Sequence, residues 1–263
     1  MRLLLKLKSK KDCIYDTKYY HKANGFVYSL LKGTPLEILH NAKTYKFFCF
    51  SNIFPLPKNE KGEIVYEIKK GEEFNWLISS PYRPFIEILK EKLEEKNEVN
   101  IGEMSFSLED LKKFEVKLPK RNVRLISATP IIIRIPERNY DKYNIPKEFR
   151  KKRYVYWRPC FPFEVFAKQL EENLIKKYEK FYQEKVDGDT LPLFEYFKFK
   201  RSVVCHFVLK DIEVKVVGSV WEFIFLELEK KRRELLKFGL ECGFGEKNSF
   251  GFGFINVLPQ FNF

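Results

Sequence analysis

The predicted order of strands and helices in the first half of the chain returns in the second half, and this repeat restricts the fold more than any other feature. In the first half, four segments have the residue pattern of strands and two have apolar residues at helical spacing. The expected strands are residues 2–8, 45–54, 72–80 and 104–118. The expected helices are residues 21–33 and 83–97. The first half therefore has the order β-α-β-β-α-β.

The second half follows the same order, with a longer first helix. Strands are expected at residues 123–135, as a pair within 200–218, and at 219–229 and 249–259. Helices are expected at residues 163–185 and 230–243. Because the split β-α-β arrangement explains both halves with short connections, we predict an α+β fold of two tandem ferredoxin-like (RRM-like) domains. They comprise residues 1–120 and 121–263 and are joined near residues 119–124.

The charge of the chain points to a polyanionic partner. Among 263 residues, 49 Lys and Arg oppose 36 Asp and Glu, which gives a net charge of +13. Nucleic acid is the favoured partner, ahead of an anionic membrane surface. No apolar run approaches the roughly 20 residues that a spanning helix needs, and residues 1–12 lack the apolar core and cleavage site of a signal peptide. We therefore expect a cytoplasmic protein that is not in a membrane.

The cysteines do not indicate a metal site. They are odd in number, widely spaced and never in a Cys-x-x-Cys pair: Cys13, Cys49, Cys160, Cys205 and Cys242. Neither zinc nor a disulfide framework is supported. Cys49 and Cys205 sit in apolar runs, where a free cysteine packs as a small core residue. We expect no metal and no cofactor.

Four of the twelve glycines flank a short polar segment near the end of the chain. Gly243 and Gly245 precede residues 246–250, and Gly251 and Gly253 follow them. Glycines of a simple turn are the plainest interpretation, but their placement on both sides also suits a loop that cradles a ligand. A phosphate loop of the ATP type is excluded, because Lys247 is followed by Asn248 and a strand-like run instead of Ser or Thr and a helix.

This glycine pattern on a tandem ferredoxin-like arrangement resembles the CRISPR-associated endoribonucleases of the Cas6 family, which cut repeat RNA into guide units. The segment YYHKANGFVYSLL, residues 19–31, is similar to the family's first helix, and residues 38–55 are similar to its histidine-containing loop and following strand. The resemblance covers nearly the whole chain. Related CRISPR proteins that do not cleave RNA also carry such glycine loops, so a non-catalytic RNA-binding subunit of an effector complex is the alternative.

The resemblance implies a reaction without a metal ion. In this family the ribose 2′-hydroxyl attacks the adjacent phosphorus and the 5′-oxygen leaves, which produces a 2′,3′-cyclic phosphate and a 5′-hydroxyl. Such a reaction needs a base for the 2′-proton, an acid for the leaving oxygen, and a cation or donor for the phosphoryl charge. A histidine suits the first task.

The expected catalytic group is His40, Tyr28 and Lys46. His40 lies in a polar, basic segment where the family places its base, Lys46 matches the family's lysine and would stabilise phosphoryl charge, and Tyr28 matches its tyrosine. Other residues remain open for these tasks: His21 is the reserve base, His206 fits better as a packed strand residue, and Tyr45 and Lys43 are alternatives to Tyr28 and Lys46.

The glycine loop and the basic helix beside it are expected to support RNA binding. The expected RNA-binding residues are Gly243, Gly245, Lys247, Gly251, Gly253, Lys231, Arg232 and Arg233. The expected partners are CRISPR repeat RNA and, through the resemblance, proteins of an effector complex, while the oligomeric state is left open with a homodimer as one alternative. A phosphate-metabolite enzyme on the same fold is a rival, but no acidic metal cluster or nucleotide fingerprint supports it.

Overall fold

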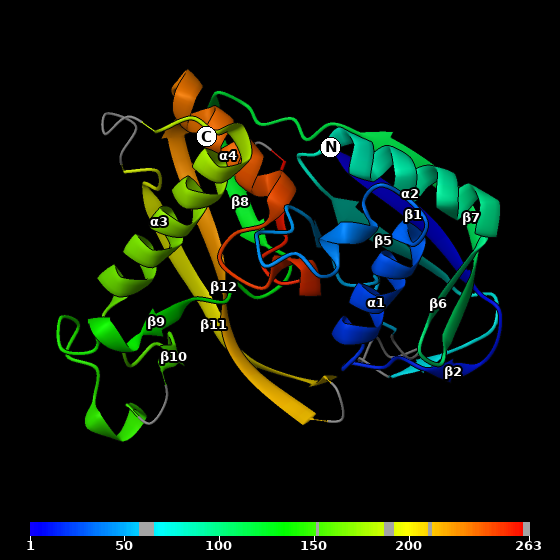
Figure 1. Cartoon of the computed structure of the whole chain (residues 1–263), viewed down its shortest axis with the longest axis horizontal. Coiled ribbons are helices and arrows are strands. Elements are labelled where there is room, and N and C mark those ends of the chain that lie inside the picture. Colours follow the sequence, from blue (N-terminus) through cyan, green and yellow to red (C-terminus); the bar gives the residue numbers. More distant parts are fainter. Residues whose placement is uncertain (58–65, 151–152, 187–191, 210–211, 260–263) are drawn as a thin grey trace. The chain divides into compact units, whose positions relative to one another are not determined.

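The computed structural model describes residues 1–57, 66–150, 153–186, 192–209 and 212–259 (Figure 1). The chain divides into two compact units. The first comprises Met1–Glu115 together with Phe207–Val214 and Ser249–Gly251. The second comprises Val116–His206, Lys215–Asn248 and Phe252–Phe263. The main division, between Glu115 and Val116, falls a few residues before the expected joint at 119–124.

The first unit is a ferredoxin-like fold with one additional edge strand. Its five-stranded sheet has the order β3-β5-β1-β7-β6, and every pairing is antiparallel. The strands are β1 (Arg2–Ser9), β3 (Cys49–Phe50), β5 (Glu73–Ser79), β6 (Glu98–Ile101) and β7 (Met104–Phe114). The helices are α1 (Tyr20–Leu31) and α2 (Arg83–Lys96), which pack against each other (Figure 1). A separate short pair joins β2 (Cys13–Ile14) to β4 (Glu67–Ile68).

The alternation of apolar and charged residues along β1 explains which face of this sheet is covered. Leu3, Leu5 and Leu7 are buried, whereas Lys6 and Lys8 between them are exposed. Helix α2 supplies a buried stripe at helical spacing, namely Phe85, Ile86, Leu89 and Leu93. Burying each of these side chains contributes about 1.5–3 kcal/mol, so the apolar face of the sheet and the helix stripes specify the register together.

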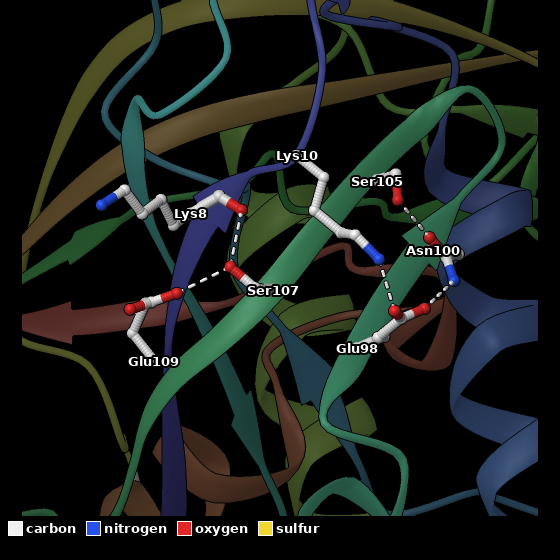
Figure 2. A network of polar contacts seen from close by, with 7 residues as sticks. All are labelled: Lys8, Lys10, Glu98, Asn100, Ser105, Ser107 and Glu109. Carbon is white, nitrogen blue, oxygen red and sulfur yellow. Dashed lines mark hydrogen bonds and ion pairs between the residues drawn. The ribbon is translucent and has the colours of Figure 1, made fainter.

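The part of the opposite face that lies toward β6 and the start of β7 is polar, whereas Arg2, Leu77 and Ser79 farther along that face are buried. Figure 2 shows a chain of contacts there that connects β1, β6 and β7. Ser105 donates to the side chain of Asn100 at 2.6 Å, Asn100 donates to Glu98, and Lys10 pairs with Glu98. Ser107 contacts both Glu109 and the backbone of Lys8. These contacts are exposed, so they contribute little to stability and leave this part of the face solvated.

The second unit repeats the ferredoxin-like topology. Its four-stranded sheet has the order β11-β12-β8-β13, and β8 pairs antiparallel with both β12 and β13. The strands are β8 (Arg121–Ser127), β11 (Tyr196–Leu209), β12 (Ile212–Glu227) and β13 (Ile255–Val257). The helices are α3 (Phe163–Tyr182) and α4 (Lys230–Cys242), which pack against each other (Figure 1). The prediction of tandem ferredoxin-like folds is confirmed.

An insertion between β8 and α3 was not predicted. It contains the two-stranded sheet of β9 (Arg134–Pro136) and β10 (Tyr154–Tyr156) and two short 3-10 helices, Glu137–Asn139 and Lys147–Phe149. The prediction of one strand over residues 123–135 was therefore wrong. β8 ends at Ser127, and the following residues make only isolated bridges, from Ile131 to Ser219 and from Ile132 to Glu246.

Three other element boundaries differ from the sequence predictions. The strand expected at 45–54 is reduced to Cys49–Phe50, because Phe47 has a left-handed backbone with φ of 51°. The pair expected within 200–218 and the strand at 219–229 are in fact two long strands, and β12 continues through Gly218. The last strand contains only Ile255–Val257, because the glycine loop occupies the preceding residues. None of the described helices has the length and apolar character needed to cross a membrane.

Candidate functional site

His40 lies on an exposed turn directly after α1. Gly33, with φ of 74°, ends the helix region, and Glu37 accepts a hydrogen bond from its amide at 2.8 Å. The 3-10 helix Glu37–Leu39 follows, and His40 caps it by donating its backbone N–H to Glu37 O at 3.1 Å. The imidazole Nδ1 lies 3.0 Å from Asn41 Oδ1. In the tautomer that matches this contact, Nδ1 donates to the amide oxygen and Nε2 is the acceptor.

Tyr28 projects from α1 onto the His40 ring. The two ring centroids are 4.9 Å apart with the rings at 89°. The Tyr28 hydroxyl hydrogen-bonds with Asn24 and with Ser249, which belongs to the same compact unit. Burial raises the pKa of Tyr28 to about 12, and these hydrogen bonds only partly offset that effect. The phenol is therefore a neutral hydrogen-bond donor at physiological pH.

Lys46 holds the turn that carries His40. Its ammonium group donates to the carbonyl oxygens of Leu39, Ala42 and His40, the last at 3.4 Å. Partial burial lowers the pKa of Lys46. The structure thus brings the three expected catalytic residues together, with Tyr28 against the His40 ring and Lys46 on the His40 backbone.

The alternative residues lie in different surroundings. His21 is half-buried in the first turn of α1, and His206 is half-buried in β11 of the second unit. Lys43 is exposed in the segment before β3. Tyr45 is 37% exposed, and its ring packs on Phe47 at 5.8 Å.

The glycine loop is a buried structure whose shape depends on its glycines. Gly243, Gly245, Gly251 and Gly253 all have positive φ and are buried. A Cβ atom on Gly253 would lie 1.9 Å from the Phe244 carbonyl oxygen, and one on Gly245 would lie 2.6 Å from the Ile132 carbonyl oxygen. Both distances are far below contact, so only glycine fits at these two positions.

Four amides of the loop are used internally. The N–H of Gly243 bonds to Gly239 O, that of Phe244 to Gly253 O, and that of Gly253 to Pro130 O, each within 2.9 Å. The Glu246 N–H bonds to Ile132 O at 2.9 Å. These four backbone donors are therefore taken by the protein itself and cannot form a phosphate cradle.

A buried lysine, which sequence reasoning missed, organises the glycine loop from inside. Lys177 of α3 is 2% exposed, and its ammonium donates to Gly243 O, Gly245 O and Asn248 Oδ1 at 2.7, 2.8 and 2.9 Å. Asn248 in turn donates to Phe244 O and Phe252 O. Lys177 continues the buried stripe of Leu170 and Leu174, and a lysine on an apolar helix face was the signal that could have revealed it.

The outer edge of the loop carries a cluster of cations and tyrosines that the sequence did not indicate. Arg134 of β9 pairs with Glu246, and its guanidinium lies 4.9 Å from the centre of the Tyr154 ring. The Tyr154 and Tyr156 rings are 5.5 Å apart. Lys247 has φ of 57°, and burial lowers its pKa, with Arg134 adding to that effect. Two cations and two phenols thus surround one carboxylate, an arrangement that can accept an anion.

The basic residues at the start of α4 are mostly engaged within their own unit. Lys231 pairs with Glu184 at 2.9 Å and lies over the Tyr178 ring. Arg232 pairs with Glu195 at 2.8 Å and donates to Leu193 O. Arg233 is half-buried, and its backbone amide continues the helix. Of the residues expected to bind RNA, Lys247 has the most suitable surroundings.

The described residues contain no group of three or more His, Cys, Asp or Glu side chains placed to hold a metal ion. All five cysteines are free, and Cys49 and Cys205 are buried as expected. The chemistry that this arrangement offers is proton transfer by His40 and Tyr28, with cations nearby.

Comparison with known proteins identifies close relatives along the whole chain. The family described as "CRISPR associated protein Cas6, C-terminal" matches residues 117–257. A protein of Methanocaldococcus jannaschii named "CRISPR-associated endoribonuclease Cas6 2" is 35% identical, over 98% of this chain and 100% of the relative. One of Haloferax mediterranei named "CRISPR-associated endoribonuclease Cas6" is 30% identical, over 99% and 94%.

Solved structures agree with this comparison. A structure described as "CRISPR associated protein Cas6" has a TM-score of 0.71 at 25% identity and covers 98% of this chain and 99% of that chain. Another, described as "An RAMP protein binding different RNA substrates", has a TM-score of 0.69 at 22% identity, with 98% and 100% covered. The second likeness establishes the shared fold.

Proposed function

Because the chain belongs to the Cas6 family of CRISPR-associated endoribonucleases, we propose that it processes CRISPR repeat RNA without a metal ion, by attack of a ribose 2′-hydroxyl on the adjacent phosphorus. The oxygen–phosphorus bond to the 5′-oxygen breaks, and the products carry a 2′,3′-cyclic phosphate and a 5′-hydroxyl. The observation that supports this proposal most directly is the pairing of His40 with Tyr28, whose rings meet at 4.9 Å.

His40 acts as the base in this proposal. Its Nδ1 proton is held by Asn41, so Nε2 accepts the proton of the 2′-hydroxyl as the oxygen attacks phosphorus. The exposed position of the turn gives RNA access to Nε2. Asn41 is a positioning residue, because it fixes the tautomer without touching the substrate.

Tyr28 supplies a neutral hydroxyl beside the scissile phosphate. Because its pKa is raised to about 12, it donates a hydrogen bond to the phosphoryl group or to the leaving 5′-oxygen and is not itself an anion that would repel the RNA. A donor placed where charge grows lowers the barrier without a metal ion. Lys46 fixes the His40 turn through three carbonyl contacts, and its positive charge favours the developing phosphoryl anion.

RNA binding in the second unit rests on the surface that the glycine loop supports. In this proposal Gly243, Gly245, Gly251 and Gly253 give the loop its shape, while Lys247 and Arg134 contact the phosphodiester backbone. Two cations with one carboxylate leave a net positive charge, which suits a phosphate. Lys231 and Arg232 add to the positive potential of the unit without leaving their ion pairs, and Arg233 adds a further positive charge.

The test compares wild-type protein with His40→Ala on labelled CRISPR repeat RNA in EDTA, followed by analysis of the product ends. We expect cyclic phosphate ends from the wild type and a rate reduced by roughly 10²–10⁴-fold in the variant, with unchanged RNA affinity. His21→Ala is the matched control and should cleave normally.

Three outcomes would contradict the proposal. Cleavage that requires a divalent cation would remove the metal-independent mechanism. Normal cleavage by His40→Ala with loss in His21→Ala would move the base to His21. Tight binding of repeat RNA without cleavage by the wild type would favour the non-catalytic effector subunit.

A further inference from the structure

The second unit contains an aromatic cavity that the reaction does not use. Its volume is about 530 Å³, and it opens to solvent between the segment before α3 and the first residues of β11. Its lining is almost entirely aromatic: Trp157, Phe161, Phe163, Tyr196, Phe197, Phe199 and Trp221, with Pro159 and Glu195. A cavity of this size holds a flat ligand the size of one or two nucleobases.

The rings of the cavity pack on one another, while three of them stay accessible: Phe163, Phe199 and Tyr196, which is 56% exposed. Trp221 forms the floor at 3% exposure, and Phe163 and Phe199 pack against it with centroid distances of 5.7 and 5.1 Å. Phe163 is nevertheless 40% exposed and Phe199 is 41% exposed. Rigid rings that keep a free face offer a stacking platform at low entropic cost.

One polar group in the cavity is held in place. Glu195 accepts from the guanidinium of Arg232 at 2.8 Å and from the Leu226 amide at 2.9 Å. The guanidinium offsets the charge of the carboxylate, so that the cavity does not repel a polyanion. The remaining lone pairs of the carboxylate can accept from an exocyclic amine of a base.

The positive charge of the segment that leads to the cavity favours RNA over other occupants. Residues 134–150 and 153–158, which lead to Trp157, contain seven Lys and Arg against three Asp and Glu, a net charge of +4 in 23 residues. The same segment contains Arg134, Tyr154 and Tyr156 of the cation cluster at the glycine loop. An apolar peptide or a lipid tail would fit the rings but would give no reason for this charge, whereas a nucleic acid strand supplies both bases and phosphates.

We propose that the cavity lined by Trp157, Phe163, Phe199 and Trp221 binds an unpaired nucleobase of the RNA, whose phosphates follow the basic segment toward Arg134 and Lys247. The inference rests on the proposed function for the identity of the RNA. It adds a base-binding site in the second unit, whereas His40 belongs to the first unit. Stacking supplies the affinity, and Glu195 favours bases that carry an exocyclic amine.

The experiment measures binding of two probes of equal charge, hexameric oligoadenylate RNA and an abasic hexamer of the same backbone. The variant is Phe163→Leu combined with Phe199→Leu, which keeps apolar volume but removes the two accessible rings that pack on Trp221. We expect the wild type to prefer the base-bearing probe by about tenfold or more, and the variant to lose that preference while its affinity for the abasic probe stays the same.

Two controls separate stacking from charge and from misfolding. Phe114→Leu removes a ring of similar exposure, 37%, from the first unit and should leave both affinities unchanged. Phe163→Tyr with Phe199→Tyr keeps the rings and should restore the preference. The salt dependence of repeat RNA binding should keep its slope in the Leu variant, whereas Lys247→Gln should reduce that slope by about 1.

The outcomes distinguish this inference from the function on which it rests. A wild-type protein that binds no repeat RNA would overturn the proposed function. A wild type that binds repeat RNA, combined with a folded Leu variant that still prefers the base-bearing probe, would overturn the base site alone. Equal affinity of the wild type for the two hexamers would also overturn it, and would leave the cavity as a candidate surface for a protein partner.

Discussion

The turn that carries His40 and the glycine-rich loop are each closed by a lysine ammonium group on backbone carbonyls, but they are built at different depths. Lys46 donates to the carbonyls around His40 from a half-buried position. Lys177 donates to Gly243, Gly245 and Asn248 at 2% exposure. The first loop presents an exposed imidazole, whereas most of the second loop is part of the core of its unit.

Because of this difference in depth, we expect the His40 turn to affect the reaction and the glycine loop to affect folding. A buried ammonium group requires all its acceptors in place. The stability of the glycine loop therefore depends on the helix that carries Lys177, and the stability of that helix depends on the loop. The His40 turn is solvated, and its distortion changes where one side chain points without costing much folding energy. Substitutions in the two loops should therefore differ in what they damage, and each prediction below tests that difference.

The largest effect is expected at Gly253. In Gly253→Ala the new methyl group would lie 1.9 Å from the Phe244 carbonyl oxygen on a backbone with φ of 70°, so the loop must shift. We expect a loss of about 3–5 kcal/mol in the free energy of unfolding, measured by chemical denaturation.

Gly33→Ala is the matched control for this substitution. Gly33 has a similar φ of 74°, but no atom lies within 4 Å of an added Cβ, so only the left-handed strain of about 1–2 kcal/mol applies. Equal losses for the two variants would mean that the glycine loop tolerates movement and is not part of the core.

The second prediction compares the two lysines directly. Lys177→Met leaves buried acceptors without their donor and should cost about 2–4 kcal/mol of stability. Lys46→Met should cost less than about 1 kcal/mol, yet it should lower the rate of RNA cleavage by about 10–100-fold, because the His40 turn loses its support. Thermal unfolding and single-turnover cleavage of the same preparations measure both quantities.

Either of two results would contradict the different roles of the two lysines. If Lys46→Met lost as much stability as Lys177→Met, the catalytic turn would be a structural element. If Lys46→Met weakened RNA binding and left the cleavage rate at saturating RNA unchanged, Lys46 would be a binding residue and not a support of His40.

The sequence predicted what depends on local pattern. Apolar spacing gave the order of both ferredoxin-like units, since residues such as Leu3, Leu5 and Leu7 or Leu89 and Leu93 must lie on one face. The glycine loop was visible because positive φ and close approach at Gly245 and Gly253 can be met by one residue type only. The three residues expected at the His40 site were found through resemblance, and the structure places them together.

What the sequence missed depends on contacts between distant residues. Lys177 is far from the glycine loop in the sequence. Its position on the apolar stripe of α3 is the one local feature that separates it from the many other lysines of the chain. The β9–β10 pair has only three residues in each strand, too few for an alternation to be recognised. The cation cluster of Arg134 and Lys247 exists only because this pair lies beside the loop.

The smallest expected effect concerns Tyr28, which is the more buried member of the His40 site. Its pKa of about 12 in the folded protein exceeds the ordinary value of 10, so the folded state keeps a proton that the unfolded state loses between these values. Its contribution to stability is complete below pH 10 and falls as the pH rises toward 12. Tyr28→Phe should therefore lose less stability than the wild type between pH 10 and pH 12, measured by chemical denaturation at each pH. If Tyr28→Phe and the wild type had parallel stability curves, burial would not hold the proton on the Tyr28 hydroxyl, and the His40 site would not contain a buried phenol.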